Sequence, residues 1–384
     1  MAAEREYDVL MFGCTGFTGA LTAEYLAANA PASTRWALAG RNMQKLKQLR
    51  DRLGVDVPLL KADVTDEKSI ADVAAGTKVV ITTVGPYINY GEPLVEACAE
   101  HGTDYTDLTG EPEFVDRMYV KYHAKAVETG ARLVHACGFD SIPHDLGAYF
   151  TVLQLPEDVP ITVTGYVRAG AGISGGTYHS AVRAFSRVRQ SSKISSQRRD
   201  VETRPSGRRV GSLPQRPARA PDGRGYALPL PTIDPVVVRR SARAVDRYGP
   251  DFRYGHFALV RKLPTAVVTP MVLGGMLAVS QLPPGRDLLL RLRRTGEGPS
   301  AEQRAKSWFK VRFVGEGGGQ RVETEVSGGD PGYDETATML AQSALCLAFD
   351  DLPGTAGQVT TVQAMGDALL RRLQVSGPRF EVVG

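Results

Sequence analysis

The three glycines of GCTGFTG, residues 13–19, are the first residues whose spacing suggests a specific chemistry. They follow an apolar run and precede a stretch of helical character, which places them between a strand and a helix. In that setting Gly13 permits a tight turn, Gly16 lets the backbone approach a pyrophosphate, and Gly19 lets the helix pack on its strand. Glycine-rich turns are common, so the pattern indicates a phosphate-binding turn only if the surrounding elements agree.

The elements expected around this turn alternate regularly. Apolar runs and helical periods predict strands at 7–12, 35–41, 57–64 and 78–87 and helices at 20–29, 43–54 and 67–76. The alternation continues with a helix at 92–102, a short strand within 103–111, a helix at 112–130 and a strand from 131. The predicted fold class is therefore α/β, with a Rossmann-type doubly wound parallel sheet whose ligand lies at the carboxyl ends of the strands.

The residues after the second strand distinguish between the two nicotinamide dinucleotides. Arg41 lies 22 residues beyond Gly19, and no acid occupies the position where an NAD enzyme places Asp or Glu for the ribose hydroxyls. An arginine there suits a 2′-phosphate, and Lys45 lies one helical turn further on. The sequence therefore predicts NADP as the cofactor.

Further polar groups follow the predicted strands. Asp63 ends the third strand, and the turn Gly85-Pro86 ends the fourth. Asp140, His144 and Asp145 follow a later strand, at the edge where cofactor-facing groups sit. Charge and capping at the start of the next helix would explain the same three residues, so a structural role stays open for them.

The composition is that of a soluble globular protein of two domains, since 384 residues contain 42% hydrophobic and 23% charged side chains. The four cysteines are far apart, with no CxxC and no His/Cys cluster at metal-ligand spacing. This cysteine usage predicts a cytoplasmic protein with no metal site. Charged residues near the N-terminus argue against a secretion signal.

Positive charge is concentrated in residues 183–224. This segment has twelve Lys/Arg against three acids, a local charge of +9, which leaves about −5 for the rest of the chain. Its Pro, Gly and Ser content predicts a long, basic loop. The loop is either a solvated surface or a docking site for an anion: a coenzyme A or phosphopantetheine phosphate, an acidic carrier protein, or a membrane face. Nucleic acid is disfavoured because no recognition motif accompanies the charge.

A second unusual segment, residues 264–285, has no charged side chain and is bracketed by basic residues. Pro270 and the pair Gly274-Gly275 weaken it as a membrane span. Three interpretations stay open: a buried core or dimer-interface helix, a surface element that contacts lipid or acyl chains, and a spanning helix.

The remaining half of the chain predicts a sheet with helices. Strands are expected near 161–169, 235–244, 252–260, 308–316 and 320–328, and helices near 177–188, 270–279 and 334–349. Alternating apolar and polar residues in KVRFV and RVETEV indicate half-exposed antiparallel strands. Such a sheet would have one face free for a partner or a second copy of the chain.

Several stretches together resemble the saccharopine dehydrogenase-like oxidoreductases, and within them the actinobacterial trans-acting enoyl reductase branch. They are GCTGFTG, AGR at 39–41, and the segments 85–111, 137–147, 174–177, 251–260 and 308–348. The resemblance implies a Rossmann domain at 1–147, a mixed α/β substrate and dimerisation domain at 148–350, and a segment at 351–384 that packs back on the first domain. It also implies a homodimer.

The resemblance assigns roles to individual residues near the cofactor. Gly13, Thr15, Gly16, Phe17, Thr18 and Gly19 match the pyrophosphate loop, Arg41 with Lys45 the 2′-phosphate contact, Asp63 the adenine side, Val84, Gly85 and Pro86 the turn beside the nicotinamide ribose, and Gly138, Phe139 and Asp140 the strand end near the nicotinamide. One departure concerns the substrate: where relatives have a GGVLTPA-like run, this chain has AGQVTTVQAMGD at 356–367.

The activity implied by the resemblance is NADPH-dependent reduction of a carbon–carbon double bond on an enoyl thioester or a lipid or polyketide intermediate. The enzyme would work in trans for a synthase or acyl carrier protein, with peripheral membrane contact as a further expectation. Two alternatives stay open. One is a saccharopine-type enzyme acting on an imine or amino acid adduct, and the other is a non-catalytic nucleotide-binding scaffold that docks to a synthase or a lipid surface.

The catalytic residues are the least determined part. No tyrosine is followed by lysine four residues later, which disfavours ketone reduction by a Tyr-Lys pair. Conjugate reduction needs donors for an enolate oxygen and a proton for the α carbon, which water could supply. Tyr178, His179 and Tyr87 are the candidate side chains, although tyrosine and histidine at such positions also serve packing. His101, His123 and His135 lie on predicted helices and strands and are interpreted as structural.

Overall fold

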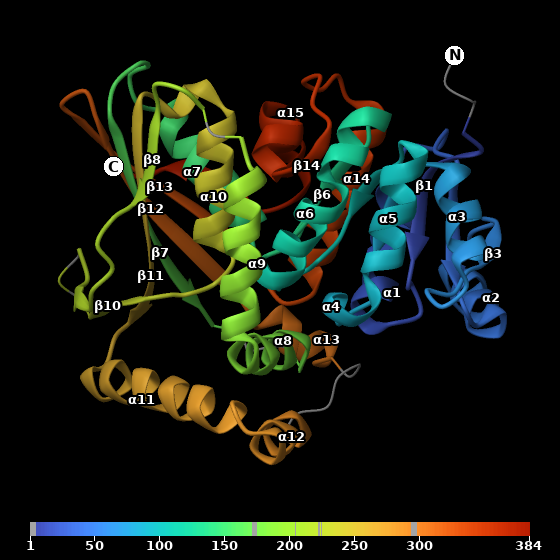
Figure 1. Ribbon diagram of the computed structural model, residues 1–384, viewed down its shortest axis with the longest axis horizontal. Helices are drawn as coiled ribbons and strands as arrows, with labels where there is room; N and C mark the ends of the chain where they lie inside the picture. The colour runs from blue at the N-terminus through green and yellow to red at the C-terminus, as the bar shows by residue number, and fades with distance from the viewer. Residues whose placement is uncertain (1–4, 171–174, 204, 222, 224, 293–297) are drawn as a thin grey trace. The chain divides into compact units, whose positions relative to one another are not determined.

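The computed structural model describes residues 5–170, 175–203, 205–221, 223, 225–292 and 298–384 (Figure 1). The chain forms two compact units. Unit 1 comprises Met1–Phe139, Ile194–Val201 and Tyr333–Gly377, and unit 2 comprises Asp140–Lys193, Glu202–Gly332 and Pro378–Gly384.

Unit 1 is built on a parallel sheet of seven described strands in the order β14-β6-β5-β4-β1-β2-β3. The strands are β1 (Tyr7–Phe12), β2 (Trp36–Gly40), β3 (Leu59–Lys61), β4 (Thr77–Thr82), β5 (Asp104–Thr106), β6 (Arg132–Val134) and β14 (Gly357–Val359). The helices are α1 (Phe17–Asn29), α2 (Met43–Leu53), α3 (Glu67–Ala75), α4 (Tyr87–Tyr90), α5 (Glu92–His101), α6 (Pro112–Thr129), α14 (Asp334–Phe349) and α15 (Thr361–Ser376). The order confirms the predicted doubly wound sheet.

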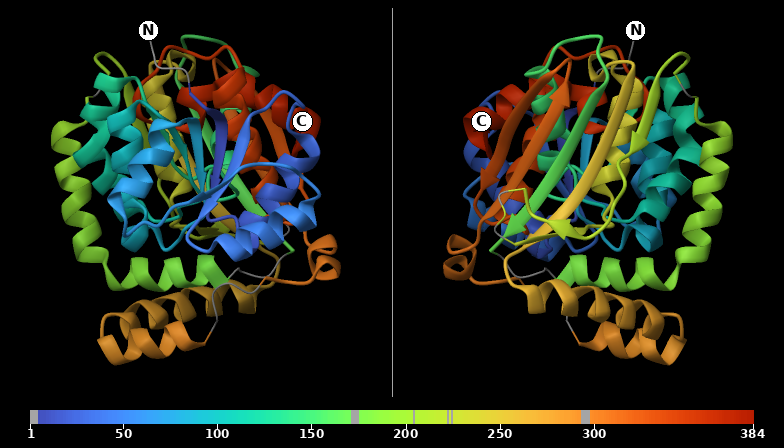
Figure 2. Two further views of the ribbon diagram at one scale, coloured as in Figure 1. Left: turned by 90° about the vertical axis from the view of Figure 1, so that its right-hand side faces the viewer. Right: turned by 90° about the vertical axis from the view of Figure 1, so that its left-hand side faces the viewer.

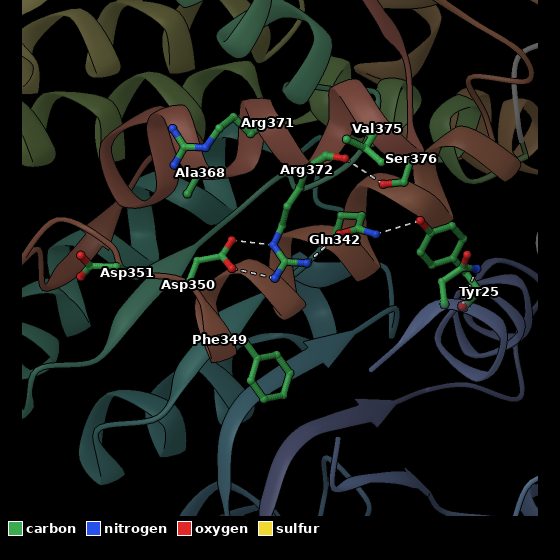
Figure 3. Close-up of a pocket in the computed structure, with 11 residues that line it drawn as sticks. Tyr25, Gln342, Phe349, Asp350, Asp351, Ala368, Arg371, Arg372, Val375 and Ser376 are labelled. Carbon is green, nitrogen blue, oxygen red and sulfur yellow. Dashed lines mark hydrogen bonds and ion pairs between the residues drawn. The ribbon is translucent and has the colours of Figure 1, made fainter. Parts of the chain in front are cut away.

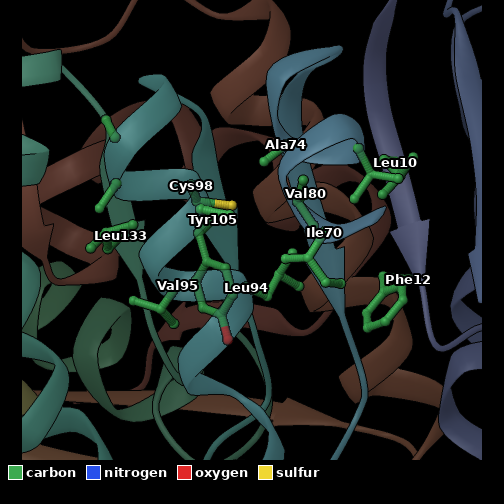
Figure 4. Close-up of a cluster of buried hydrophobic side chains, with 14 of the residues drawn as sticks. Leu10, Phe12, Ile70, Ala74, Val80, Leu94, Val95, Cys98, Tyr105 and Leu133 are labelled. Carbon is green, nitrogen blue, oxygen red and sulfur yellow. The ribbon is translucent and has the colours of Figure 1, made fainter. Parts of the chain in front are cut away.

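The core of unit 1 lies where α3, α5 and α6 pack side by side on the sheet (Figure 4). Leu10 and Val80, from neighbouring central strands, are fully buried there against Ile70 of α3 and Leu94 of α5. β1 is buried along its whole length, as expected for a central strand of a parallel sheet that is covered on both faces. This packing fixes the carboxyl ends of β1, β2 and β4, which carry the loops of the candidate site.

Unit 2 contains a mixed sheet of eight described strands in the order β15-β13-β12-β7-β11-β10-β9, with β8 paired to β11. The strands are β7 (Ile161–Ala169), β8 (Arg209–Ser212), β9 (Ala218–Arg219), β10 (Tyr226–Pro229), β11 (Asp251–Val260), β12 (Phe309–Gly317), β13 (Gln320–Gly328) and β15 (Arg379–Val382). The helices are α7 (Ile142–Leu153), α8 (Gly175–Ser186), the first part of α9 (Val188–Val201), α10 (Asp234–Ala244), α11 (Leu263–Ser280), α12 (Pro283–Arg291) and α13 (Ala301–Ala305), with a 3₁₀ turn at Asp246–Tyr248.

The two faces of the second sheet differ in polarity. α7 and α10 pack on one face, where Val311 and Phe313 of β12 are buried. The intervening side chains carry charge: Lys310 pairs with Glu325 on β13 at 2.5 Å, in an antiparallel ladder. This alternation confirms the predicted half-exposed antiparallel strands.

The unit boundaries differ from the predicted domains at 1–147, 148–350 and 351–384. Unit 2 already begins at Asp140, because α7 packs on the second sheet. α14 belongs to unit 1, because it packs on α1, α15 and the central strands. Residues 351–377 also lie in unit 1, but the last residues form β15, which pairs with β13 of unit 2.

Two local predictions were wrong. Residues 235–244, predicted as a strand from the run PVVV, form most of α10, because Pro235 starts a helix and Val237, Val238 and Ser241 are buried at helical spacing. The basic segment 183–224 is not one long loop, since α8 and α9 occupy its first part. Arg198 of α9 is buried, with its guanidinium 3.3 Å from Asp116 within unit 1.

The apolar segment predicted at 264–285 forms α11 and the start of α12 in unit 2. By length and composition α11 could cross a membrane. The interpretation as a buried core helix is wrong, because only Ala266 and Ser280 of α11 are buried. Pro270 lies inside this helix.

Candidate nucleotide and proton-transfer sites

The turn at 13–19 leaves no space for a side chain at two of its glycines. Gly13 has a φ of +83°, and a Cβ there would lie 2.6 Å from Val84 Cγ2. A Cβ on Gly19 would lie 2.5 Å from the Gly13 carbonyl oxygen. At Gly16 the shortest distance would be 3.6 Å, an ordinary contact. The chain therefore needs glycine at 13 and 19 for its own packing, whereas at 16 the missing side chain leaves backbone open to a ligand.

The amino end of α1 directly follows this turn. Gly16 is its N-cap and provides no side chain to cap the first N–H groups. Thr15 is exposed, and the Phe17 ring meets Tyr333 edge-on with centroids 4.9 Å apart. The backbone hydrogen bonds of the helix begin with the Gly16 carbonyl, which accepts the Ala20 N–H at 2.8 Å, and the Thr18 carbonyl accepts the Thr22 hydroxyl at 2.9 Å. Free N–H groups at a helix start attract a pyrophosphate through hydrogen bonds and the helix dipole.

Exposed cations lie at the carboxyl end of β2. Arg41 follows the last residue of this strand, and the Asn42 side chain caps α2 by accepting the Lys45 N–H at 3.0 Å. Asp63, after β3, accepts the Thr65 N–H and hydroxyl at 3.0 and 2.9 Å. These Thr65 contacts, with Arg41 adding a smaller effect, lower the pKa of Asp63. Two exposed cations beside a helix start are suited to a 2′-phosphate.

The turn after β4 completes this edge of the sheet. The Val84 N–H donates to Thr82 Oγ1 at 3.2 Å, and the Gly85 N–H donates to the Thr83 carbonyl at 3.2 Å. The Gly85–Pro86 peptide bond is cis. Since Val84 also contacts the position of Gly13, the predicted nicotinamide-ribose turn and the phosphate turn are packed against each other.

Tyr87 begins α4 and is buried. Its hydroxyl donates to the Thr82 carbonyl at 3.1 Å and accepts the Leu108 N–H at 3.1 Å. Burial raises the pKa of Tyr87 well above its ordinary value. The Glu111 carboxylate accepts the Tyr87 N–H at 3.2 Å. These contacts are those of a structural residue, and a catalytic role for Tyr87 stays a prediction without support from its geometry.

The loop after β6 is also closely packed within unit 1. A Cβ on Gly138 would lie 2.7 Å from Leu108 Cδ2, and the Phe139 N–H donates to Thr336 Oγ1 at 3.1 Å. Unit 1 therefore fixes the backbone up to Phe139, and Asp140 follows directly in the chain.

A buried aspartate lies behind these loops in unit 1. Asp107 Oδ2 is 2.7 Å from His135 Nδ1 and accepts the Tyr105 hydroxyl at 2.9 Å. Its Oδ1 accepts the backbone N–H groups of Ala136 at 2.8 Å and Thr109 at 3.0 Å. The contacts with His135 and Ala136 connect the loop after β5 to the end of β6, which supports the structural interpretation of His135.

Unit 2 contains a polar cluster of which sequence reasoning had named only His144. His144 Nε2 of α7 lies 3.7 Å from Asp234 Oδ1 of α10, and His256 Nε2 of β11 lies 3.5 Å from Asp234 Oδ2. His256 Nδ1 is 3.1 Å from the Tyr254 hydroxyl, and Thr232 donates to Asp234. All three ion-pairing side chains are buried. One signal was available: Tyr254 and His256 lie on the buried face of a strand, where apolar residues are usual.

The charge of this cluster affects Asp140. Burial and the nearby Asp234 carboxylate raise the pKa of Asp140 to about 7. Burial lowers the pKa of His144 to about 4, so this imidazole is neutral at pH 7. A carboxyl group with a pKa near 7 can both hold and release a proton at neutral pH.

The same cluster bears on the expectation of no metal. Its donor atoms from His144, Asp234 and His256 lie within 4.8 Å of one another, and two imidazoles with one carboxylate form a donor set that zinc accepts. The contacts with Tyr254 and Thr232 already hold two of these side chains in place. The absence of a metal stays a prediction.

Tyr178 and His179 lie on α8, in unit 2. The Tyr178 hydroxyl donates to the Leu289 carbonyl of α12 at 3.0 Å. The rings of Tyr178 and His179 lie with their centroids 6.1 Å apart. The Gly175-Gly176 pair belongs to the helix rather than to a turn, and Ser174 lies outside the described residues. The hydroxyl contact connects α8 to α12, and catalytic roles for both residues stay predictions.

A pocket of about 650 Å³ lies among α1, α14 and α15 of unit 1 (Figure 3). Across it Arg372 holds Asp350 through two hydrogen bonds of 2.5 and 2.7 Å, and Gln342 donates to the Tyr25 hydroxyl at 2.8 Å. These pairs link the three helices, so their polar groups serve packing.

The residues at the strand ends fit a dinucleotide. After β1 comes a helix start without a side-chain cap and a glycine, Gly16, at which a Cβ would have only ordinary contacts. Two exposed cations follow the neighbouring parallel strand β2. The assignment of these residues to the pyrophosphate and the 2′-phosphate stays a prediction.

Known proteins resemble this chain in sequence and in fold. Residues 9–134 match the family model described as the saccharopine dehydrogenase NADP binding domain. Rv2449c of Mycobacterium tuberculosis, described as a trans-acting enoyl reductase, is 38% identical over an alignment of 410 positions that covers 98% of this chain and 97% of that protein. A trans-acting enoyl reductase of Mycobacterium bovis is 36% identical over 409 residues, with the same coverage. A third relative, a trans-acting enoyl reductase of Mycobacterium ulcerans, is 35% identical.

The fold also has a solved counterpart. Apo saccharopine dehydrogenase (L-Glu forming) from Saccharomyces cerevisiae aligns with a TM-score of 0.58 at 13% identity, covering 98% of this chain and 99% of that one. At this identity the likeness concerns the fold.

Proposed function

Because the chain belongs to the saccharopine dehydrogenase-like family and, within it, to the trans-acting enoyl reductases, we propose that it reduces the carbon–carbon double bond of an enoyl thioester with NADPH. The observation that carries this proposal is 36% sequence identity to a trans-acting enoyl reductase over 98% of the chain, combined with a nucleotide turn and two exposed cations at the strand ends. The substrate class is a lipid or polyketide intermediate.

The residues of unit 1 bind the cofactor in this proposal. The backbone at Gly16 and the start of α1 hold the pyrophosphate, and Arg41 with Lys45 holds the 2′-phosphate. When bound, the nicotinamide supplies the hydride that is added to the β carbon of the substrate. The turn at Val84–Pro86 and the loop at Gly138-Phe139 form the edge against which that end of the cofactor would lie.

Asp140 is the proposed source of the second hydrogen. Addition of hydride to the β carbon leaves negative charge on the α carbon and the thioester oxygen, and the α carbon must then take a proton. Asp140 follows the loop at the end of β6 directly, and its raised pKa of about 7 lets it carry that proton at neutral pH. The Asp234 carboxylate opposes ionisation of Asp140 and so favours its protonated form.

Action in trans requires that a separate synthase or carrier protein presents the substrate. The part of α9 that belongs to unit 2 offers two exposed cations, Arg189 and Lys193. Acidic carrier proteins and phosphopantetheine phosphates are both attracted to such charge. This part of α9 is therefore the proposed docking segment.

The test is oxidation of NADPH by the purified chain with matched enoyl thioesters on coenzyme A and on an acyl carrier protein. We expect turnover with both, and a lower KM for the carrier-bound substrate that Arg189→Ala and Lys193→Ala raise together. An incubation with a 2-oxo acid and an amino acid runs in parallel. Turnover only in that incubation would assign the chain to imine reduction, and NADPH binding without turnover on any acceptor would favour the scaffold alternative.

A further inference from the structure

The helix α11 exposes apolar side chains along its whole length. Over 18 residues its mean hydropathy is 1.6, yet only 11% of that window is buried. The exposed large apolar residues are Leu263, Val267, Val268, Met271, Val272, Leu273, Leu277 and Val279. Because runs such as Met271–Leu273 turn by about 100° per residue, they cover more than one face of the helix.

The next helix continues this surface. α12 and the residues at its ends expose Leu282, Leu288 and Leu292. Its position is fixed within unit 2, since Leu289 is buried and its carbonyl accepts the Tyr178 hydroxyl. Gln281, between the two helices, donates to the Phe185 carbonyl of α8 at 2.7 Å. Figure 2 shows α11 and α12 as a pair beside α8, and we call this pair the apolar hairpin (residues 263–292).

Positive charge surrounds the apolar hairpin. Residues 261–294 contain six Lys/Arg and a single acid, a net charge of +5. Arg261 and Lys262 are exposed immediately before α11, and Arg291 is exposed at the end of α12. The acid, Asp287, is 3.6 Å from Arg286. Apolar side chains flanked by cations are suited to the boundary between anionic headgroups and acyl chains.

The connections of α11 decide between lying on a membrane and crossing it. α11 starts directly after β11, and at its other end Gln281 is bonded to α8 of the same unit. Both ends are therefore fixed to one folded body, so α11 cannot cross a bilayer without drawing that body through it. Pro270 within the helix also weakens a spanning role.

We propose that the apolar hairpin inserts into the surface of an anionic lipid bilayer and so brings the enzyme to a lipid phase. A second copy of the chain is the less suitable occupant, because a helix-helix contact covers one stripe of a helix, whereas α11 is exposed on several sides. The proposal does not depend on which reaction the chain catalyses.

The test is flotation of the full chain with vesicles. One preparation contains phosphatidylcholine with phosphatidylglycerol, and the other phosphatidylcholine alone. We expect the wild type to float with the anionic vesicles, and Met271→Asp with Val272→Asp to weaken binding by at least tenfold. Both positions are exposed, so folding is unaffected, as circular dichroism would verify. The matched control is Val375→Asp, an equally apolar position that is 90% exposed on α15 of unit 1, which should bind like the wild type.

A second pair of variants tests the charge. Arg261→Ala with Lys262→Ala should weaken binding to anionic vesicles by about fivefold for each charge removed, and added salt should remove the difference. Wild-type protein that floats with neither preparation would overturn the proposal. So would a wild-type dimer, measured by analytical ultracentrifugation without vesicle binding, that Met271→Asp with Val272→Asp converts to a monomer.

Discussion

Two buried aspartates, one in each unit, lie beside histidines but are held very differently. Asp107 of unit 1 has four polar contacts at 2.7–3.0 Å, two of them from backbone N–H groups. Asp234 of unit 2 faces two imidazoles at 3.5 and 3.7 Å. The first arrangement fixes loops in place, whereas the second leaves its charge available to perturb a neighbour, Asp140. The same residue types thus serve structure in one unit and, in the proposed reaction, favour the protonated form of the proton donor Asp140 in the other.

The largest effect is expected on kcat, from a substitution of Asp140. Asp140→Asn removes the proposed proton donor and should lower kcat by about 10²–10⁴-fold. In the wild type the protonated carboxyl is the active form, so kcat should fall as the pH rises through about 7. The pH profile of kcat for both proteins is the measurement, with NADPH affinity as the control. A variant with the wild-type rate and profile would exclude Asp140 as the donor.

The raised pKa of Asp140 also makes the stability of the wild-type protein depend on pH. The folded carboxyl has a pKa of about 7, above the ordinary 3.8, so the native state holds the proton more tightly than the unfolded chain does. The free energy of unfolding of the wild type should therefore fall as the pH rises from 3.8 to about 7. Urea unfolding at several pH values should show a smaller decline for Asp140→Asn.

Asp107→Asn should act on stability instead. The amide would turn an N–H group toward donors that now meet a carboxylate, which should cost about 3 kcal/mol of unfolding free energy. The decline of kcat above pH 7 should stay where it is in the wild type. Asp72→Asn, at an exposed carboxylate on α3, is the matched control and should cost less than about 1 kcal/mol. A shifted pH profile in Asp107→Asn would remove the distinction between the two aspartates.

An exposed charge gives the next smaller effect. Arg41→Ala should weaken NADPH binding by about 1.5–3 kcal/mol and leave NADH binding nearly unchanged, because only NADPH carries the 2′-phosphate. Titrations with both nucleotides measure this. Arg52→Ala, at an exposed arginine in the last turn of α2, the helix that follows Arg41, should change neither affinity. Equal losses for NADPH and NADH would contradict the assignment of Arg41.

The smallest effect is expected far from both aspartates. A Cβ on Gly274 of α11 would meet nothing within 4 Å, so Gly274→Ala should stabilise this exposed helix by up to about 1 kcal/mol. The pH profile and the NADPH affinity should not move. Gly19→Ala is the opposing case, because its Cβ would lie 2.5 Å from a carbonyl oxygen. A Gly19→Ala variant with the unfolding free energy of the wild type would show that the turn at 13–19 can shift to accommodate a side chain.

The sequence predicts those parts of the molecule that depend on local patterns. Glycine is required at 13 and 19 because neighbouring atoms leave no room for a Cβ, and the spacing of these glycines predicted the turn. The β-branched run in α10 led to a wrong prediction, because burial of one face of a helix outweighed the strand preference of valine. The cluster around Asp234 was missed because its members come from α7, α10 and β11, which only the tertiary fold brings together.

The path of the chain has a consequence for how the protein is made. β14, which pairs with β6 in unit 1, and β15, which pairs with β13 in unit 2, both lie near the C-terminus. Neither sheet is therefore complete until residues 357–382 have been synthesised and have folded. Until then the outer edges of β6 and β13 stay unpaired, and such open strand edges expose a folding chain to aggregation.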